Sequence, residues 1–237
     1  MAVTSRYESV SVEGDGFDAY CAVPESRTGP GVLLFQEIFG INDNIRELAD
    51  RLAVAGYVTL APDMFWRIER RFERKDESGL GDAFAMVQKL DLEKAADDIR
   101  AAHAHLVGMP ECTGEIGAVG FCLGGALAFT AATRSRVNGR GIDAAVCYYG
   151  SAINDMLDHV DGLECPSMYH YGSLDAFITP DKIDQVEAAL SGCPGVEFHR
   201  YAAGHAFSNW DAPSMYNEAA ADEAWTRTLD FFARHLW

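Results

Sequence analysis

The chain has few basic residues and no long apolar run. Its 237 residues include 19 Lys and Arg against 36 Asp and Glu, which gives a formal net charge of −17. Because nucleic-acid binding depends on basic side chains that neutralise phosphates, this charge argues against a nucleic-acid partner. No apolar stretch approaches the roughly 20 residues that cross a bilayer, and the N-terminus shows no signal-peptide pattern. We therefore expect a cytoplasmic protein without a membrane partner.

The motifs of common cofactor and metal sites are also missing. The six cysteines include no C-x-x-C pair, so we expect them to be reduced, and the seven histidines do not match a metal-ligand spacing such as H-E-x-x-H. The glycines between positions 117 and 125 miss the G-x-G-x-x-G dinucleotide spacing, and no Gly-Lys-Ser/Thr follows them as in a P-loop. The sequence therefore predicts no metal and no cofactor.

Short apolar segments alternate with longer helical patterns along the chain. No linker or repeat divides it, so residues 1–237 are expected to form a single α/β domain. Strand–helix alternation predicts a mostly parallel central sheet with helices on both faces. Residues 7–23 are expected to form one or two antiparallel strands. Further strands are expected at 31–35, 58–61, 116–119, 144–148, 167–171 and 196–201, and helices at 42–55, 83–106, 122–133, 181–190 and 219–236. Asn42 or Asp43 is the expected N-cap of the first helix, and Pro180 suits a helix start.

The most informative motif is GFCLGG at residues 120–125. It lies between an apolar strand pattern and an alanine-rich helix pattern, which is the form of a nucleophile elbow with Cys122 in place of serine. The glycines allow a turn so tight that larger side chains on either side of the nucleophile would collide. The following helix directs its N-terminus at the sulfur and favours a thiolate. The alternative is an unreactive buried cysteine at a glycine-rich turn.

Two downstream residues favour the catalytic interpretation. Enzymes with such an elbow place the acid and then the histidine after the nucleophile. Asp175 follows the strand predicted at 167–171, and His205 follows the strand predicted at 196–201. Both therefore lie on loops at carboxyl ends of strands, where open α/β sheets keep their sites. This order predicts a triad of Cys122, Asp175 and His205.

The motifs together resemble those of the dienelactone hydrolase, or carboxymethylenebutenolidase, family. The resemblance rests on QEIFG at 36–40, the cysteine elbow, YYG at 148–150, Asp175 and GH at 204–205, and it extends from about residue 8 to the C-terminus. It implies an α/β-hydrolase fold and an enzyme that opens an enol-lactone ring. It also implies that Cys122 is the nucleophile, His205 the base and Asp175 the residue that orients the base.

The resemblance assigns roles to three further groups. Glu37, which follows a buried strand, corresponds to a family glutamate that contacts the nucleophile and takes its proton when substrate arrives. A carboxylate beside a cysteine raises the pKa of the thiol, so Glu37 would hold Cys122 in a resting state. The alternative for Glu37 is a solvated loop residue. The backbone N–H groups of Leu123 and Ile38 are expected to form the oxyanion hole.

The residues that would bind the substrate depart from the family pattern. Family members hold a substrate carboxylate with arginines, but Asn209 stands at one of these positions, Ala206 replaces an adjacent serine, and residues 80–85 contain no arginine. The basic run FWRIERRFERK at 65–75 follows the end of a predicted strand and is a candidate replacement for the missing carboxylate-binding arginines. The alternative is that the run forms a solvated surface. The predicted substrate-binding residues are Tyr148, Trp66, Arg67, Arg70 and Trp210.

The sequence leaves three functions open. The first is a cysteine-dependent hydrolase of an enol-lactone or ester, acting on a small molecule through an acyl-enzyme thioester. The second is a hydrolase of another ester or of a thioester. The third is a non-catalytic small-molecule binder or redox sensor on the same fold, although a sensor would not need Asp175 and His205 in triad order. We expect a monomer or a small homo-oligomer.

Overall fold

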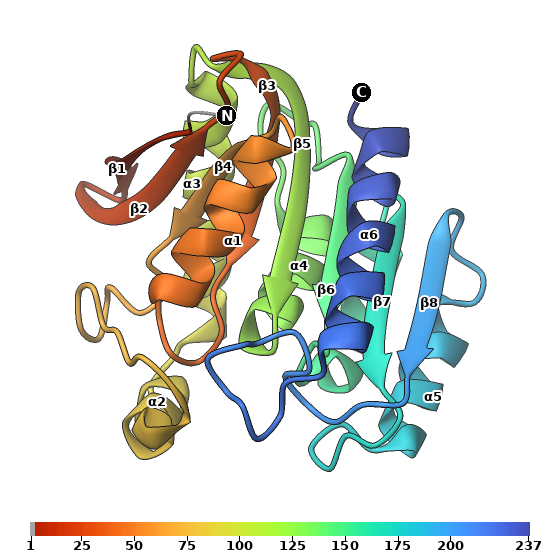
Figure 1. The fold of residues 1–237 in the computed structure, drawn as a ribbon. Helices are drawn as coiled ribbons and strands as arrows, with labels where there is room; N and C mark the ends of the chain where they lie inside the picture. Colours follow the sequence, from red (N-terminus) through yellow and green to blue (C-terminus); the bar gives the residue numbers. More distant parts are fainter. Residues whose placement is uncertain (1–2) are drawn as a thin grey trace.

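The protein is built around one eight-stranded sheet. The computed structural model describes residues 3–237, with strand order β1-β2-β4-β3-β5-β6-β7-β8 (Figure 1). The pairs β1–β2 and β2–β4 are antiparallel, and all other neighbouring strands are parallel. The strands are β1 (Thr4–Val12), β2 (Asp15–Val23), β3 (Gly29–Phe35), β4 (Val58–Pro62), β5 (Cys112–Phe121), β6 (Ala144–Tyr148), β7 (Ser167–Gly172) and β8 (Val196–Tyr201). The predicted fold class, an α/β-hydrolase fold with a mostly parallel sheet, is confirmed.

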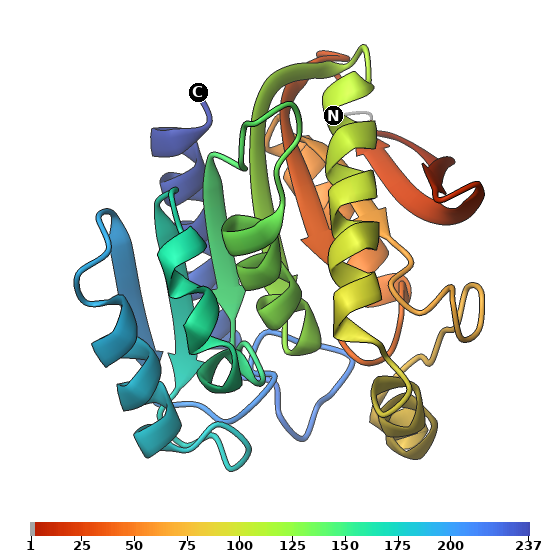
Figure 2. The ribbon, with the colours of Figure 1, turned by 180° about the vertical axis from the view of Figure 1, so that it is seen from behind.

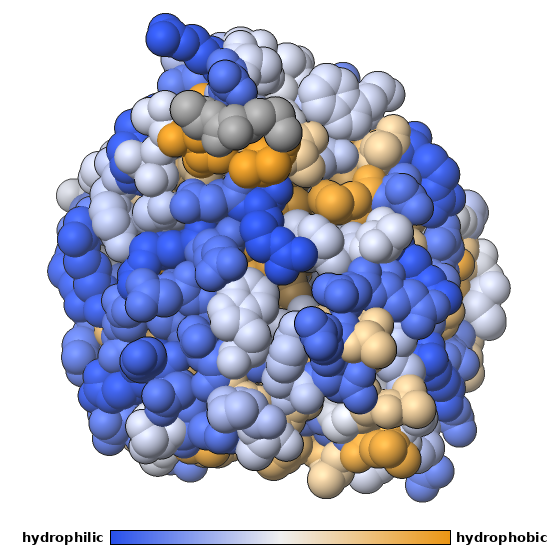
Figure 3. All heavy atoms as spheres, in the orientation of Figure 1, coloured by the Kyte–Doolittle hydropathy of each residue, from blue (hydrophilic) through white to orange (hydrophobic). Residues whose placement is uncertain are grey.

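Helices cover both faces of the sheet. Helices α1 (Asp43–Val54) and α6 (Glu218–His235) lie in front of it in Figure 1. Helices α3 (Leu92–Gly108), α4 (Leu123–Arg134) and α5 (Pro180–Leu190) cover the opposite face (Figure 2). Three short 3₁₀ helices occupy Glu77–Gly79, Ile153–Asp155 and Leu157–Gly162. The surface on the side of Figure 1 is predominantly hydrophilic (Figure 3), and no helix within residues 3–237 is long and apolar enough to span a membrane.

The predicted helix starts and buried strands agree with the structure. Asn42 is the N-cap of α1, where its side-chain oxygen accepts a hydrogen bond of 3.2 Å from the N–H of Ile45. Pro180 occupies the first turn of α5, where its missing N–H has no cost. Every residue of β3 and of β6 is buried, as expected for strands with helices on both sides.

The single helix predicted at 83–106 is wrong. The structure has two helices, α2 (Leu80–Val87) and α3, separated by a four-residue break. Asp91 causes the restart, because its carboxylate accepts hydrogen bonds from the N–H groups of Glu93 and Lys94 and caps α3. Helix α2 therefore lies apart from the sheet, beyond the carboxyl ends of its parallel strands (Figure 1).

Candidate active site

Cys122 lies at the turn between β5 and α4. Its φ of 55° and ψ of −113° place it in a conformation that residues other than glycine rarely adopt. A Cβ atom added to Gly120 would lie 1.9 Å from the carbonyl oxygen of Gly124, and one added to Gly124 would lie 2.2 Å from that of Phe35, so backbone packing requires glycine at both positions. The sequence thus builds a strained turn that projects the sulfur from the carboxyl end of the sheet.

Parallel strands bring the other two triad candidates to this sulfur. Asp175 follows β7 and His205 follows β8, and both strands end at the same edge of the sheet as β5 (Figure 1). His205 Nε2 lies 3.1 Å from Cys122 Sγ, and His205 Nδ1 lies 2.7 Å from Asp175 Oδ2. The three side chains thus form one continuous chain of hydrogen bonds.

Asp175 is fixed by the backbone of its own loop. Its Oδ1 atom accepts hydrogen bonds of 2.7 and 2.9 Å from the N–H groups of Phe177 and Ile178. Burial by itself raises the pKa of Asp175, but the bonds from His205 and from these N–H groups outweigh it and lower the pKa. The carboxylate is therefore ionised at neutral pH and holds the imidazole in one orientation.

His205 is charged in this arrangement. Burial lowers its pKa, but the attraction of the Cys122 sulfur and the hydrogen bonds with Asp175 and Cys122 outweigh burial and raise the pKa to about 10. The proton therefore resides on His205 at neutral pH, and Cys122 faces an imidazolium. An imidazolium at 3.1 Å favours the thiolate, which is the nucleophilic form of cysteine.

The imidazolium beside the sulfur predicts fast alkylation of Cys122. Because a positive charge 3.1 Å from Sγ favours the reactive thiolate, we expect iodoacetamide at pH 7 to alkylate Cys122 faster in the wild type than in His205→Ala, by on the order of tenfold. Mass spectrometry of the peptide that contains Cys122 measures both rates.

His159→Ala provides the control for this experiment. His159 lies near Asp158 on the surface, and its removal should leave the alkylation rate of Cys122 unchanged. A His205→Ala enzyme that is alkylated as fast as the wild type would contradict the ion pair.

Ser151 also contacts the sulfur, which the sequence did not predict. Its hydroxyl lies 3.4 Å from Cys122 Sγ, and its N–H donates a hydrogen bond of 3.1 Å to the Cys122 carbonyl. Ser151 follows β6, so its place at the carboxyl end of a strand was the signal that could have identified it. It stabilises both the sulfur and the turn that presents it.

Glu37 is buried at the same cavity as Cys122 but bonds to other groups. It accepts hydrogen bonds of 3.0 Å from the Tyr149 hydroxyl and 2.6 Å from Asn209 Nδ2. Burial raises its pKa, and the bonds from Asn209 and Tyr149 offset this only in part. Within residues 3–237, no hydrogen bond joins Glu37 to Cys122, and the contact implied by the family resemblance stays a prediction.

The two predicted oxyanion-hole residues border the sulfur. Leu123 is the first residue of α4, so its N–H has no acceptor within the helix. Ile38 follows Glu37 on the loop after β3, and both Leu123 and Ile38 line the cavity that contains Cys122. Their role as oxyanion donors remains a prediction.

The cavity at Cys122 has a volume of about 310 Å³ and is largely apolar. Its walls come from the loop after β3, from α2, from the start of α3, from α4 and from the loops after β6, β7 and β8. Large apolar side chains on these walls include Leu80, Phe84, Val87, Leu127, Met156 and Phe177. Helix α2 thus forms a wall of the site, and it contains residues 80–85, where the family resemblance placed a substrate-binding segment.

The basic run is absent from the lining of this cavity, so the cavity gives no support to the predicted substrate-binding roles of Trp66, Arg67 and Arg70. The indole N–H of Trp66 and the guanidinium of Arg67 both bond to the buried carboxylate of Asp98. Arg70 bonds to Asp15 and to the carbonyl of Gly16. Acidic partners on neighbouring elements therefore hold these side chains away from Cys122.

Tyr148 and Trp210 are also absent from the cavity lining. Tyr148 is fully buried, and its hydroxyl bonds to Thr228 of α6 at 2.6 Å, so it points into the layer between sheet and helix. Trp210 lies beside the guanidinium of Arg51. Its neighbour Asn209 contacts the site through a hydrogen bond to Glu37.

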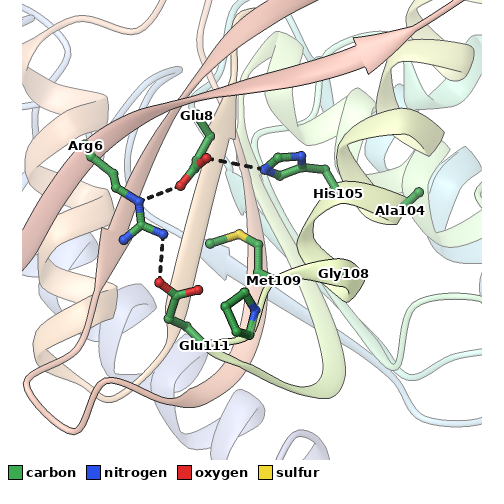
Figure 4. A pocket seen from close by; sticks show the side chains of 8 residues that line it. Arg6, Glu8, Ala104, His105, Gly108, Met109 and Glu111 are labelled. Atoms are coloured by element: carbon green, nitrogen blue, oxygen red, sulfur yellow. Dashed lines mark hydrogen bonds and ion pairs between the residues drawn. The ribbon is translucent and has the colours of Figure 1, made fainter.

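A second cavity, of about 390 Å³, lies near the amino end of β5 (Figure 4). Its charged groups pair with one another: Arg6 bonds to Glu8 and Glu111, and His105 lies 3.8 Å from Glu8. Cys122 lies at the opposite end of β5 and lines a different cavity. Among the described residues, no group of three or more His, Cys, Asp or Glu side chains is arranged to hold a metal ion.

Comparison with known proteins agrees with the geometry. A model of the dienelactone hydrolase family matches residues 17–236. A carboxymethylenebutenolidase from Pseudomonas sp. (strain P51) is 34% identical over 231 residues, which cover 95% of this chain and 94% of that protein. Carboxymethylenebutenolidase 1 from Cupriavidus pinatubonensis is 32% identical, with 95% of each chain covered.

A solved structure extends this agreement to the fold. The crystal structure of a putative dienelactone hydrolase from Klebsiella pneumoniae superposes with a TM-score of 0.83 at 27% identity. The superposition covers 99% of this chain and all of the other.

Proposed function

Since the chain belongs to the dienelactone hydrolase family and is a carboxylic ester hydrolase, we propose that it cleaves an ester or enol-lactone bond by attack of Cys122. The observation that carries the proposal is the unbroken series from Cys122 Sγ through His205 to Asp175, with separations of 3.1 and 2.7 Å. Nucleophile, base and orienting acid in hydrogen-bond contact are what covalent acyl transfer requires.

The first half of the reaction uses the charge state of the resting site. The Cys122 thiolate attacks the carbonyl carbon of a small ester or lactone and forms a tetrahedral oxyanion. The N–H groups of Leu123 and Ile38 are the proposed donors to this oxyanion, and loss of one such donor typically costs about 2.7–4 kcal/mol of transition-state stabilisation. The proton on His205 then passes to the leaving oxygen as the thioester forms on Cys122.

The second half depends on the change in charge at Cys122. Once the sulfur is acylated, His205 loses the negative partner that contributes to its high pKa. The imidazole is then neutral, deprotonates a water molecule and delivers hydroxide to the thioester. Asp175 stabilises the imidazolium that forms again, and release of the acid restores the ion pair.

Glu37 keeps a proposed role beside this cycle. Burial raises its pKa, so its carboxyl group is suited to accept a proton inside the cavity. In the ion pair of Cys122 and His205 the proton is already on His205, so Glu37 would receive the thiol proton only in a second conformation, in which Cys122 is a thiol and Glu37 has left Tyr149 and Asn209.

Trapping the acyl-enzyme tests the proposal. Mixing the enzyme with excess p-nitrophenyl hexanoate is expected to release one p-nitrophenolate per enzyme in a burst. Acid quenching should then preserve an acyl group on Cys122, because thioesters survive at low pH. Mass spectrometry of proteolytic peptides locates this group, and treatment with neutral hydroxylamine removes it.

Two results would contradict the proposal. An acyl group on another residue would show that this residue, and not Cys122, is the nucleophile. Hydrolysis that continues after complete alkylation of Cys122 would exclude Cys122 as the nucleophile. Binding of small esters without hydrolysis would instead favour the non-catalytic binder or the redox sensor.

A further inference from the structure

No arginine or lysine lines the cavity at Cys122. All of its lining residues lie within residues 3–237, and the cationic group among them is the His205 imidazolium, which already pairs with Asp175 and the sulfur. Arginines on neighbouring segments are also paired, Arg74 with Asp82 and Arg67 with Asp98. A carboxylate on a bound substrate would therefore find no unpaired counter-charge, and an unpaired buried charge is costly.

The polar side chains of the cavity are already engaged. Both oxygens of Glu37 accept hydrogen bonds from Tyr149 and Asn209, and the hydroxyl of Thr130 donates to the carbonyl of Ala126 within α4. His205 and Ser151 contact the sulfur.

The entrance of the cavity is apolar as well. Phe84 on α2, Leu92 at the start of α3 and Phe177 after β7 line the cavity, yet remain 46%, 45% and 58% exposed. Large apolar side chains that are half exposed around a cavity indicate a binding surface for an apolar group.

We propose that the site takes uncharged esters or lactones with apolar substituents and discriminates against substrates that carry a carboxylate. This substrate class rests on the proposed cysteine-dependent hydrolysis. It differs from what the basic run had suggested, because the arginines of that run are committed to structural ion pairs.

A matched pair of esters tests the inference. p-Nitrophenyl hexanoate and the mono-p-nitrophenyl ester of adipic acid have the same leaving group and six-carbon acyl chains, but the second ends in a carboxylate. At pH 7 we expect kcat/KM for the hexanoate to exceed that for the half-ester by on the order of a hundredfold. Along the series acetate, butanoate and hexanoate, each added methylene should raise kcat/KM by about fourfold until the cavity is filled.

Salt separates the cavity from the overall charge of the protein. A net charge of −17 repels anions at long range, but this repulsion is screened at 0.5 M NaCl. The preference for the hexanoate should persist at that salt concentration. A preference that disappears there would overturn the role of the cavity.

A pair of variants at Phe84 places the selectivity within the cavity. Phe84→Arg introduces a cation on α2 and is expected to raise the relative kcat/KM for the half-ester by about tenfold. Phe84→Gln, which is polar but uncharged, is expected to leave the ratio of kcat/KM for the half-ester to kcat/KM for the hexanoate within twofold of the wild-type value. Equal effects of the two variants would overturn the inference.

The outcomes distinguish this inference from the proposed function. If both esters are hydrolysed equally well in a reaction that requires Cys122, the substrate class is wrong and the mechanism stands. If neither ester is hydrolysed, the proposed function fails and the inference fails with it.

Discussion

Cys122→Ala is expected to lower kcat for ester hydrolysis by a factor of about 10⁴ to 10⁶. The thioester cannot form without the sulfur, and the imidazolium of His205 loses the charge with which it pairs. What remains is the stabilisation that binding and the oxyanion donors give to attack by water, which in such enzymes leaves a small rate above the uncatalysed one. Hydrolysis of p-nitrophenyl hexanoate under saturating conditions measures the effect.

Cys193→Ala is the control for this prediction. Cys193 is a free, partly buried thiol in the turn after α5 and does not line the cavity at Cys122. Its replacement should leave kcat within a factor of two, and both variants should unfold close to the wild-type temperature. A Cys122→Ala enzyme with wild-type kcat would remove Cys122 from the mechanism.

The triad geometry was predictable because it depends on topology alone. Parallel strands end at the same edge of a sheet, so residues that follow β5, β7 and β8 meet whatever the detailed packing. The order of Cys122, Asp175 and His205 along the chain was therefore enough to predict that these three residues lie together. The strand and helix positions followed in the same way from apolar segments and from capping residues such as Asn42.

The substrate pocket was not predictable in this way. The basic run lay at the correct end of β4, but whether Arg67 or Arg70 reaches a substrate depends on which acidic side chains other elements bring near. Asp98 on α3 and Asp15 at the start of β2 are far from the run in sequence, and they capture these guanidinium groups. The orientation of a long charged side chain is set by the oppositely charged group nearest to it in the fold, which its sequence position does not reveal.

Helix α2 shows a second reason for the failure. The helical pattern at 83–106 is continuous in apolar spacing, so only the capping carboxylate of Asp91 indicates that it divides. Because the break separates α2 from α3, Leu80, Phe84 and Val87 line the cavity at Cys122. The family resemblance pointed to residues 80–85 as a substrate-binding segment, but the predicted single helix did not show that this segment forms an apolar wall.

Gly124→Ala is expected to destabilise the protein by about 4 kcal/mol or more and to abolish activity. Gly124 packs against the end of β3, where an added Cβ atom would lie 2.2 Å from the carbonyl oxygen of Phe35 and 2.6 Å from that of Gln36. Both contacts are with backbone, so no side chain can move to relieve them. The start of α4 would have to shift, and with it the N–H of Leu123 and the sulfur of Cys122.

Thermal unfolding followed by circular dichroism measures this effect. A loss of this size corresponds to a fall of roughly 10 °C in Tm for a chain of this length. Gly108→Ala is the matched control, since Gly108 ends α3 and an added Cβ atom meets nothing within 4 Å. Alanine there should leave Tm within about 2 °C. If Gly124→Ala kept wild-type Tm and activity, the close approach of α4 to β3 would not be what shapes the nucleophile turn.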